Sequence, residues 1–299
     1  MPLSFAQLRR GAPMPSRRPA TPPDAANAHD ALRGLAKWQL ERDDVSDPNG
    51  RIYRDANGEI YHSVTRILKE TSNSKAALAA WVARLGEELA NVERNTAAER
   101  GTRTHNAAEY VLRSAKKLAI GAANKRGTLY EKPDGLIRTP APLTRWALKQ
   151  VLPSAPKVGF SASGYRRGLL AWIEENVTAI HAIEFSVHHP AGFAGTCDAL
   201  LDVNGKGPVI VDWKTSFNKR SEELLEDYMD QLGAYSVGLR HLTGIQAKGA
   251  IVVVARRAGP PNIRELSALE LRGAESRYLE RCDKYFDELH RLRSDAPSS

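Results

Sequence analysis

Two apolar strands joined by a tight turn dominate the stretch from residue 192 to 216, GFAGTCDALLDVNGKGPVIVDWKTS. Apolar and β-branched residues over 194–203 and 208–215 predict strands, and the Asn204-Gly205 pair between them is a strong signal for a hairpin turn. A hairpin of this kind buries at least one face in a core. The stretch therefore requires a sheet and a layer of structure that covers it.

The segments on either side of the hairpin complete an α/β pattern. Residues 181–188 and 249–256 are predicted as further strands, the second a valine-rich run typical of a buried strand. A helix is predicted over 221–242, and Ser267 with Glu270 forms a capping box before a long C-terminal helix. This order predicts an α/β domain with one mixed central β-sheet flanked by helices.

The N-terminal half is predicted to be mainly helical. Apolar residues recur at helical spacing over 75–94, 102–117 and 165–177. Gly101 is expected to break the chain between the first two of these helices. Residues 118–160 mix glycine, proline and basic residues, and they have no clear periodicity.

Composition bounds the domain organisation and the cellular compartment. Residues 1–45 hold six prolines and few large apolar side chains, which predicts a flexible tail before a single domain over 46–299. No apolar run is long enough to span a membrane. Two cysteines exclude a disulfide framework and an iron–sulfur cluster within this chain, and no GxxxxGK[ST] nucleotide motif occurs. We expect an intracellular, cytoplasmic protein, with the mitochondrial matrix as the alternative because four arginines precede the first acid.

Positive charge is concentrated in one part of the chain. Residues 113–167 carry 12 lysines and arginines against two acids, a net charge of +10, although the whole chain carries only +8. A concentrated basic segment is typical of a binding site for a polyanion. The alternative is a basic insertion that charge keeps solvated, and composition alone does not choose between the two.

Three charged residues lie inside the hairpin where a core favours apolar ones. Asp212 and Lys214 are two residues apart, so they share a face of their strand, and Trp213 points to the opposite face. Asp198 lies on the partner strand, near enough to face Asp212. Carboxylates that converge repel one another unless a cation lies between them, and Mg²⁺ or Mn²⁺ prefers such oxygen ligands.

Two interpretations of these residues are open. In the first, the backbone carbonyl of Trp213 is a further metal ligand and Lys214 stands beside a metal-bound water. In the second, Asp212 and Lys214 form a buried ion pair, which is costly. The spacing D-x13-D-x-K across one hairpin favours the first.

Four stretches of the chain resemble motifs of one enzyme family. In chain order they are RGTRTH at 100–105, GFAGTCDALLDV at 192–203, VIVDWKTS at 209–216 and DQLGAY at 230–235. Together they resemble the PD-(D/E)xK nuclease superfamily and, within it, the RecB-type exonuclease branch with its small phage and mitochondrial members. The resemblance implies a restriction-endonuclease-like α/β core.

The resemblance also implies a role for each matching residue. Asp198 and Asp212 would bind the metal, and Lys214 would assist the nucleophilic water. His105 would be either a further metal ligand or a residue that supports the ligands from its helix. The side chains implied to contact DNA are Gln231, Tyr235, Thr215 and Ser216. Four residues of the basic segment are expected to meet phosphates without sequence preference: Lys116, Lys117, Lys125 and Arg126.

Two acids have two interpretations each. Glu184 is either a metal-site residue or a structural acid at the start of a strand. Glu109 either orients His105 or only shares the same face of its helix.

These features predict a Mg²⁺- or Mn²⁺-dependent DNA exonuclease that hydrolyses phosphodiester bonds and prefers single-stranded DNA or free ends. One alternative is a structure-selective endonuclease of the same fold. The other is a DNA-binding module that does not cleave, which the complete set of Asp198, Asp212 and Lys214 argues against. No iron–sulfur cluster, bound nucleotide or membrane partner is expected.

Overall fold

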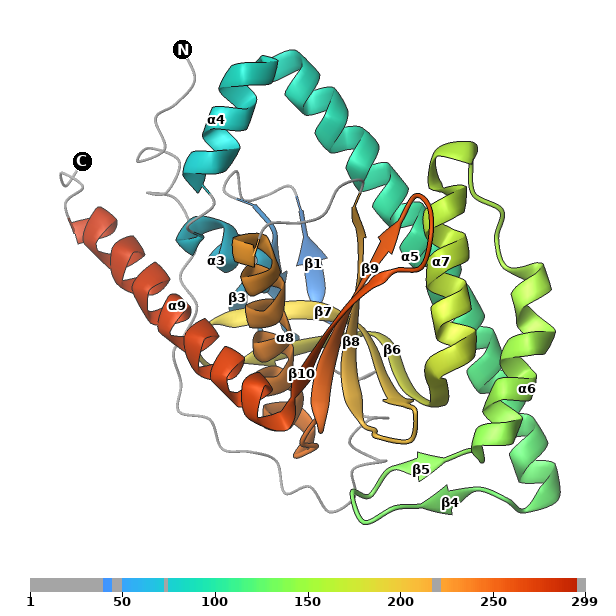
Figure 1. Cartoon of the computed structure of the whole chain (residues 1–299). Helices are drawn as coiled ribbons and strands as arrows, with labels where there is room; N and C mark the ends of the chain where they lie inside the picture. Colours follow the sequence, from blue (N-terminus) through green and yellow to red (C-terminus); the bar gives the residue numbers. More distant parts are fainter. Residues whose placement is uncertain (1–39, 45–49, 73–74, 217–221, 295–299) are drawn as a thin grey trace.

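The computed structural model describes residues 40–44, 50–72, 75–216 and 222–294 (Figure 1). Most of the tail expected over residues 1–45 and the N-cap expected at Ser221 lie outside the described residues. No helix of the described part is both long and apolar enough to cross a membrane.

One eight-stranded mixed sheet forms the centre of the fold, as predicted. The strands run in the order β1-β2-β3-β7-β8-β9-β10, and β6 pairs with β7. The pairs β3·β7 and β8·β9 are parallel and the others are antiparallel. The strand bounds are β1 Glu41–Asp43, β2 Ile52–Arg54, β3 Ile60–Ser63, β6 Val177–His189, β7 Phe193–Val203, β8 Val209–Ser216, β9 Gly249–Arg256 and β10 Asn262–Ser267.

The predicted hairpin is β7 and β8. Its turn places Asn204 at a φ of 49° and Gly205 at a φ of 76°. Two successive left-handed residues give the twist that a short hairpin turn needs, which explains the Asn-Gly pair.

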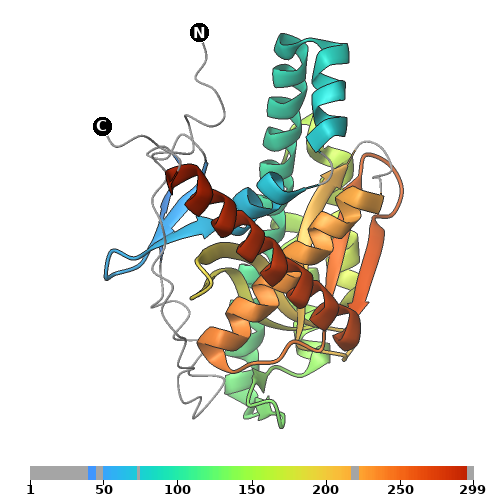
Figure 2. The same cartoon turned by 90° about the vertical axis from the view of Figure 1, so that its left-hand side faces the viewer.

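Helices cover both faces of the sheet (Figures 1 and 2). On one face, apolar residues of β7 and β8 such as Leu200 and Ile210 pack in a core with residues of α8 and α9. On the other face, Val211 and Trp213 pack in a core with residues of α5 and α7. The helix bounds are α3 Val64–Thr71, α4 Lys75–Leu85, α5 Glu87–Arg126, α6 Ala141–Val151, α7 Phe160–Asn176, α8 Glu222–Thr243 and α9 Ala268–Ser294.

The break expected at Gly101 is wrong, because α5 runs through this residue as one helix of 40 residues. The chain turns earlier, at Gly86, whose φ of 84° is open to glycine and strained for other residues. Gly101 keeps helical backbone where α5 passes β8: a Cβ there would lie 3.6 Å from Thr215 Oγ1. This is an ordinary contact distance, so Gly101 neither ends the helix nor is required by a close approach.

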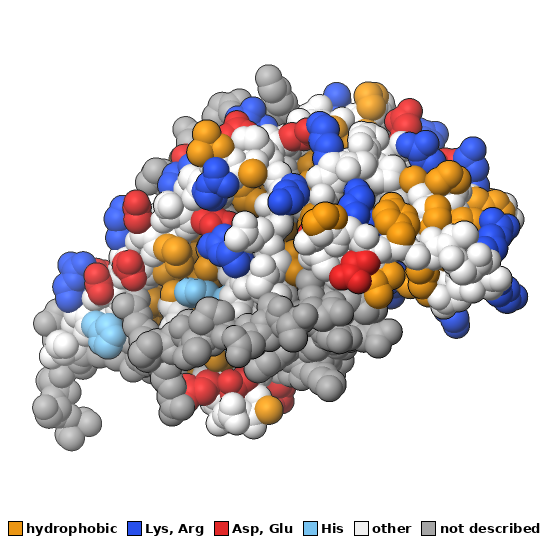
Figure 3. Space-filling view, turned by 90° about the horizontal axis from the view of Figure 1, so that it is seen from below, with side chains coloured by type: hydrophobic (Ala, Val, Ile, Leu, Met, Phe, Trp, Pro, Cys, Tyr) orange, Lys and Arg blue, Asp and Glu red, His pale blue; other side chains and the backbone are white. Residues whose placement is uncertain are grey.

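The basic segment 113–167 is structured throughout rather than a loop. It comprises the second half of α5, the hairpin of β4 (Tyr130–Glu131) and β5 (Ile137–Arg138), α6, the 3₁₀ turn η1 (Leu152–Ser154) and the start of α7. Seen from below, lysine and arginine side chains are spread over the surface with acidic and apolar ones between them (Figure 3). The basic residues therefore do not gather into one patch on this face.

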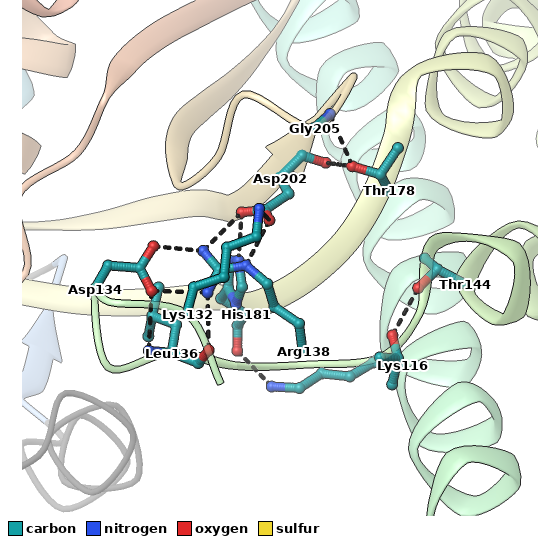
Figure 4. A network of polar contacts seen from close by, with 11 residues as sticks. Lys116, Lys132, Asp134, Leu136, Arg138, Thr144, Thr178, His181, Asp202 and Gly205 are labelled. Atoms are coloured by element: carbon teal, nitrogen blue, oxygen red, sulfur yellow. Dashed lines mark hydrogen bonds and ion pairs between the residues drawn. The ribbon is translucent and has the colours of Figure 1, made fainter. Parts of the chain in front are cut away.

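A buried polar network ties the β4–β5 hairpin to the main sheet (Figure 4). Arg138 is almost fully buried, and its guanidinium donates to Asp202 Oδ2 over 2.6 Å and to both carboxylate oxygens of Asp134. Asp202 also pairs with His181 Nε2 at 2.7 Å. These partners hold the pKa of Asp202 near 2, although its burial alone would raise it.

The same helix α5 covers the outer edge of the sheet. Among the described strands, β6 pairs only with β7, so its other edge is open to a further partner. Arg113 donates to the backbone carbonyl of Ile183, and Lys116 donates to that of His181. Two basic side chains of α5 thus donate hydrogen bonds to carbonyls at the edge of β6 that lacks a partner strand among the described residues.

Further differences from the sequence-based expectations lie at the edges. Residues 41–43, inside the expected tail, form β1 and pair with β2. The strands β1, β2 and β10 were not predicted, because each is short and takes its register from a neighbour. The capping box was predicted correctly: Ser267 N–H donates to Glu270 Oε2 and Glu270 N–H donates to Ser267 Oγ.

Candidate metal centre

Three carboxylates lie side by side across β6, β7 and β8. The register pairs Ile183 with Ala199, and Ala199 with Val211. One residue further on, Glu184 is therefore next to Asp198, and Asp198 is next to Asp212. The sheet itself brings the two predicted aspartates together and adds Glu184 to them.

Asp198 is buried at the point where β7 and β8 stop pairing through their backbones. The paired residues of β7 and β8 end with Ala199 and Val211. Beyond them, Trp213 N–H donates to Asp198 Oδ2 over 2.6 Å, so the carboxylate takes the place of a backbone acceptor. This bond holds one oxygen and leaves Oδ1 facing α5.

His105 reaches the same place from α5, as the sequence motif predicted. Its Nδ1 lies 3.5 Å from Asp198 Oδ1. Burial alone would lower the pKa of His105, but the charge of Asp198 raises it above the usual value. The imidazole is therefore held close to a carboxylate and within reach of a shared cation.

Glu184 completes a cluster with His105 and Asp198. One ligand atom from each of the three residues lies within 4.8 Å of the others. Glu184 has a φ of 47°, which is rare for a glutamate. The residues before and after it in β6 pack into the cores on opposite faces of the sheet. Burial, followed by the charge of Asp198, raises the pKa of Glu184 to about 7. The structure therefore favours the metal-site interpretation of Glu184.

Asp212 and Lys214 lie together on β8, and Trp213 packs on the opposite face against Trp172, with ring centroids 5.8 Å apart. Burial and the nearby Asp198 raise the pKa of Asp212 to about 6, although Lys214 opposes the shift. Burial would lower the pKa of Lys214, but Asp212 and Asp198 raise it. The lysine therefore stays protonated beside the carboxylates.

Gln231 and Tyr235 of α8 fix the other oxygen of Asp212. Gln231 Nε2 donates to Asp212 Oδ1 over 3.1 Å and lies 2.7 Å from Tyr235 Oη. The two side chains are only 6% and 3% exposed. Such buried positions suit the orientation of a carboxylate better than the contact with DNA that we expected.

The other residues singled out from the sequence lie further from the cluster. Thr215 is half-buried and Ser216 is buried at the end of β8. Glu109 pairs with Arg113 at 2.7 Å, which favours the interpretation that it only shares the helix face of His105.

The four basic residues expected to meet phosphates are not gathered at the cluster. Lys116 is half-buried and donates to the backbone of β6. Lys117, Lys125 and Arg126 are exposed, but 20 residues of helix separate His105 from Lys125, about 30 Å.

The donor set fits a hard divalent cation. Ligand atoms of Glu184, Asp198 and His105 lie within 4.8 Å of one another, and the neighbouring Asp212 Oδ2 is buried without a hydrogen bond and forms an ion pair with the Lys214 ammonium. Oxygen ligands with a single nitrogen suit Mg²⁺ or Mn²⁺. A bound cation would also offset the repulsion that raises the pKa of Glu184 and Asp212.

The protein has an α/β fold, in which helices cover a mixed sheet. Its carboxylates, imidazole and lysine lie close together, and such a set of groups is suited to binding a divalent metal. The family model of the PD-(D/E)XK nuclease superfamily matches residues 63–296. The chain belongs to this superfamily, as the sequence motifs indicated.

Other comparisons add little. A search of curated proteins found no match. The solved structures that resemble this chain include Rai1 of Scheffersomyces stipitis, at 10% identity, 56% coverage of each chain and a TM-score of 0.22. They also include the same protein in complex with (3'-NADP)+ and calcium ion, at 11% identity, 62% coverage of this chain, 59% of the other and a TM-score of 0.24. This chain thus spans just over half the length of those structures, and likenesses this weak support no conclusion about it.

Proposed function

We propose that this protein is a Mg²⁺-dependent DNA exonuclease of the RecB type that prefers single-stranded DNA or free ends. The observation that carries the proposal is the cluster of His105, Glu184 and Asp198, with Asp212 next to Asp198 on the neighbouring strand and Lys214 paired with Asp212. The RecB-type motifs in the sequence support the choice of an exonuclease acting on DNA.

The carboxylates and the imidazole, with the carbonyl of Trp213, would hold the ion. A bound Mg²⁺ or Mn²⁺ supplies Lewis-acid chemistry: it lowers the pKa of a water ligand and offsets charge on a phosphate. Lys214 keeps its proton at Nζ and is placed to donate it in a hydrogen bond to the attacking water or to a phosphate oxygen. Gln231 holds Asp212 Oδ1, so that Oδ2 stays turned toward Lys214.

An endonuclease of the same fold would use the same groups, so the test must compare ends. Linear single-stranded DNA labelled at either end, circular single-stranded DNA and closed circular duplex are each incubated with Mg²⁺ or with EDTA. We expect the linear strand to be degraded only with metal and both circles to survive. Linearisation of a circle would establish the endonuclease instead, and full activity in EDTA would exclude the metal mechanism.

If the wild-type protein bound DNA but did not cleave it in the presence of metal, this would support the alternative of a DNA-binding module that does not cleave. A matched RNA strand in the same assay tests the preference for DNA. The fate of the label, released first from the 5′ or the 3′ end, gives the polarity.

A further inference from the structure

Three segments that lie far apart in the sequence meet beside the metal centre. They are the middle of α5, the first turns of α7 and the loop between β9 and β10 (Figure 1). A Cβ on Gly159 would lie 2.8 Å from Arg103 Nη1, and one on Gly164 would lie 1.8 Å from the backbone oxygen of Arg257. The glycines at the start of α7 therefore allow it to pack closely against both of its neighbours.

This meeting point lies at the end of the sheet that carries the catalytic groups. Arg103 precedes His105 by two residues on the same helix. Arg256 pairs in register with Ser216, two residues beyond Lys214 on β8. The surface therefore adjoins the end of β8 that carries Lys214.

The surface is cationic. Residues 155–167 and 255–264 contain no acid, and each carries three basic residues. Lys157, Arg256 and Arg257 are exposed. Arg103 is exposed as well, although it also pairs with Glu99 on α5. A surface of this charge attracts the phosphates of a nucleic acid.

Phe160 occupies the first position of α7, in the segment of this surface that carries Lys157. Its side chain is 89% exposed, more than any other large apolar side chain that the structure describes. A single exposed apolar residue usually needs no explanation. Phe160 here, however, directly follows Gly159, whose backbone packs against Arg103, and comes three residues after Lys157.

We propose that Phe160 is a stacking platform for one base of the single-stranded DNA substrate, while Arg103, Lys157 and Arg256 bind the phosphates on either side. The inference rests on the proposed function, because it names where that substrate lies outside the metal centre. Every base has an aromatic face, so stacking is tolerant of sequence and suits an enzyme that degrades any strand.

The test measures binding rather than cleavage. Wild-type protein and Phe160→Ala are titrated in EDTA with a fluorescein-labelled oligothymidine, and anisotropy gives the Kd. We expect Phe160→Ala to bind about 5- to 100-fold more weakly, the range that the loss of one base–aromatic stack gives. Phe160→Trp should retain the affinity, because it keeps an aromatic face.

Two controls separate stacking from a general loss of surface. Trp146→Ala removes another exposed aromatic, 42% exposed on α6 and beside Arg126 at the far end of α5, and should leave the Kd unchanged. An oligonucleotide with abasic sites keeps the phosphates but has no bases to stack. Wild-type protein should bind it more weakly than oligothymidine, and Phe160→Ala should bind it as well as wild type does.

The inference would be overturned if wild type and Phe160→Ala bound oligothymidine with equal affinity. It would also be overturned if the substitution weakened binding of the abasic strand as much as binding of oligothymidine. These outcomes do not depend on hydrolysis. Failure of the proposed function would instead appear as an absence of cleavage by wild-type protein with Mg²⁺, which the binding experiment does not measure.

Discussion

Asp212 and Lys214 occupy positions of β8 where neighbouring residues are valine, isoleucine and tryptophan, and this placement gives a direct test. We expect Asp212→Asn and Lys214→Ala to lower the cleavage rate by about 100-fold or more, the usual effect of removing one catalytic group. Digestion of a labelled strand with Mg²⁺ measures the rate, and circular dichroism checks the fold of each variant.

Lys206→Ala is a matched control, because Lys206 lies in the turn at the other end of the same hairpin and its side chain is 73% exposed. It should digest DNA at the wild-type rate. Near wild-type digestion by Asp212→Asn or Lys214→Ala would contradict the assignment of the site.

Glu184 in its charged form should destabilise the folded protein when no metal is bound. Its pKa rises from 4.5 in the unfolded chain to about 7 in the folded one, because of burial and then Asp198. The protonated side chain is favoured on folding, so its contribution is present below pH 4.5 and is lost as the pH rises through 7. In EDTA at pH 8, Glu184→Gln should therefore have a higher Tm than wild type, by about 2–4 °C per kcal/mol gained.

Addition of Mg²⁺ should reverse this order, because a bound ion stabilises the folded state in proportion to its affinity. Wild type should gain more Tm than Glu184→Gln when Mg²⁺ is titrated in a thermal-shift assay. Equal gains for the two proteins would mean that Glu184 does not hold the ion.

At the scale of residues, the sequence predicted the chemistry better than the geometry. Asp198, Asp212, Lys214 and His105 converge as expected, because their motifs specify both residue type and element. The role of Glu184 could not be decided from the sequence, since it depends on the cross-strand register that only the folded sheet shows. The DNA contact expected of Gln231 and Tyr235 stays a prediction, and their burial could not be anticipated because a motif does not say which side chains are buried.

At the scale of elements, the unbroken helix α5 makes a prediction about two glycines. In Gly101→Ala, the added methyl group meets only Thr215 Oγ1, at an ordinary 3.6 Å. Alanine favours a helix interior over glycine by roughly 0.5–1 kcal/mol, so this variant should be more stable. Urea unfolding measures the change, and a loss of stability would indicate that α5 is broken at this point.

Gly195→Ala on β7 is the contrasting variant. Its methyl group would lie 2.8 Å from Tyr235 Cε1 and 3.1 Å from Val64 Cγ2, so the ring must move. A displaced Tyr235 would disturb the contact of Gln231 with Asp212. We expect this variant to lose both stability and activity, whereas Gly101→Ala keeps its activity.

The elements that were predicted share strong local signals. β7, β8 and β9 have long apolar runs, and α9 has its capping box. Within residues 118–160, α6 did have a signal that we missed, since its buried Leu143, Ala147 and Val151 recur at helical spacing. The β4–β5 hairpin had none, because tertiary contacts hold it in place. Arg138 fixes β4 and β5 through Asp202, a residue 64 positions away in the chain.

At the scale of the whole molecule, three histidines make stability depend on pH. The rings of His188 and His241 lie 6.4 Å apart, and those of His189 and His241 lie 5.1 Å apart. Burial, followed by the charge of His241, lowers the pKa of His188 and of His189 to about 4. A lowered pKa gives stability that is present above 6.5, the value in the unfolded chain, and is lost as the pH falls toward 4.

We therefore expect the contribution of these histidines to the free energy of unfolding to be lost as the pH falls from 6.5 toward 4. In His188→Leu the slope of the free energy of unfolding against pH in this range should be smaller by about 1.4 kcal/mol per pH unit, the effect of removing one proton taken up on unfolding. Urea titrations at several pH values measure it, and His290→Leu, at an exposed histidine on α9, is the matched control. An unchanged slope in His188→Leu would contradict the prediction.

The cover that α5 gives to β6 has a consequence for how copies of this protein behave in a crowded solution. A long strand with unpaired carbonyls is a template on which another chain can add a strand, and such contacts lead to aggregation. Arg113 and Lys116 of α5 donate hydrogen bonds to two of those carbonyls. The helix that delivers His105 to the metal centre thus also protects the protein from self-association, so shortening α5 would threaten solubility together with activity.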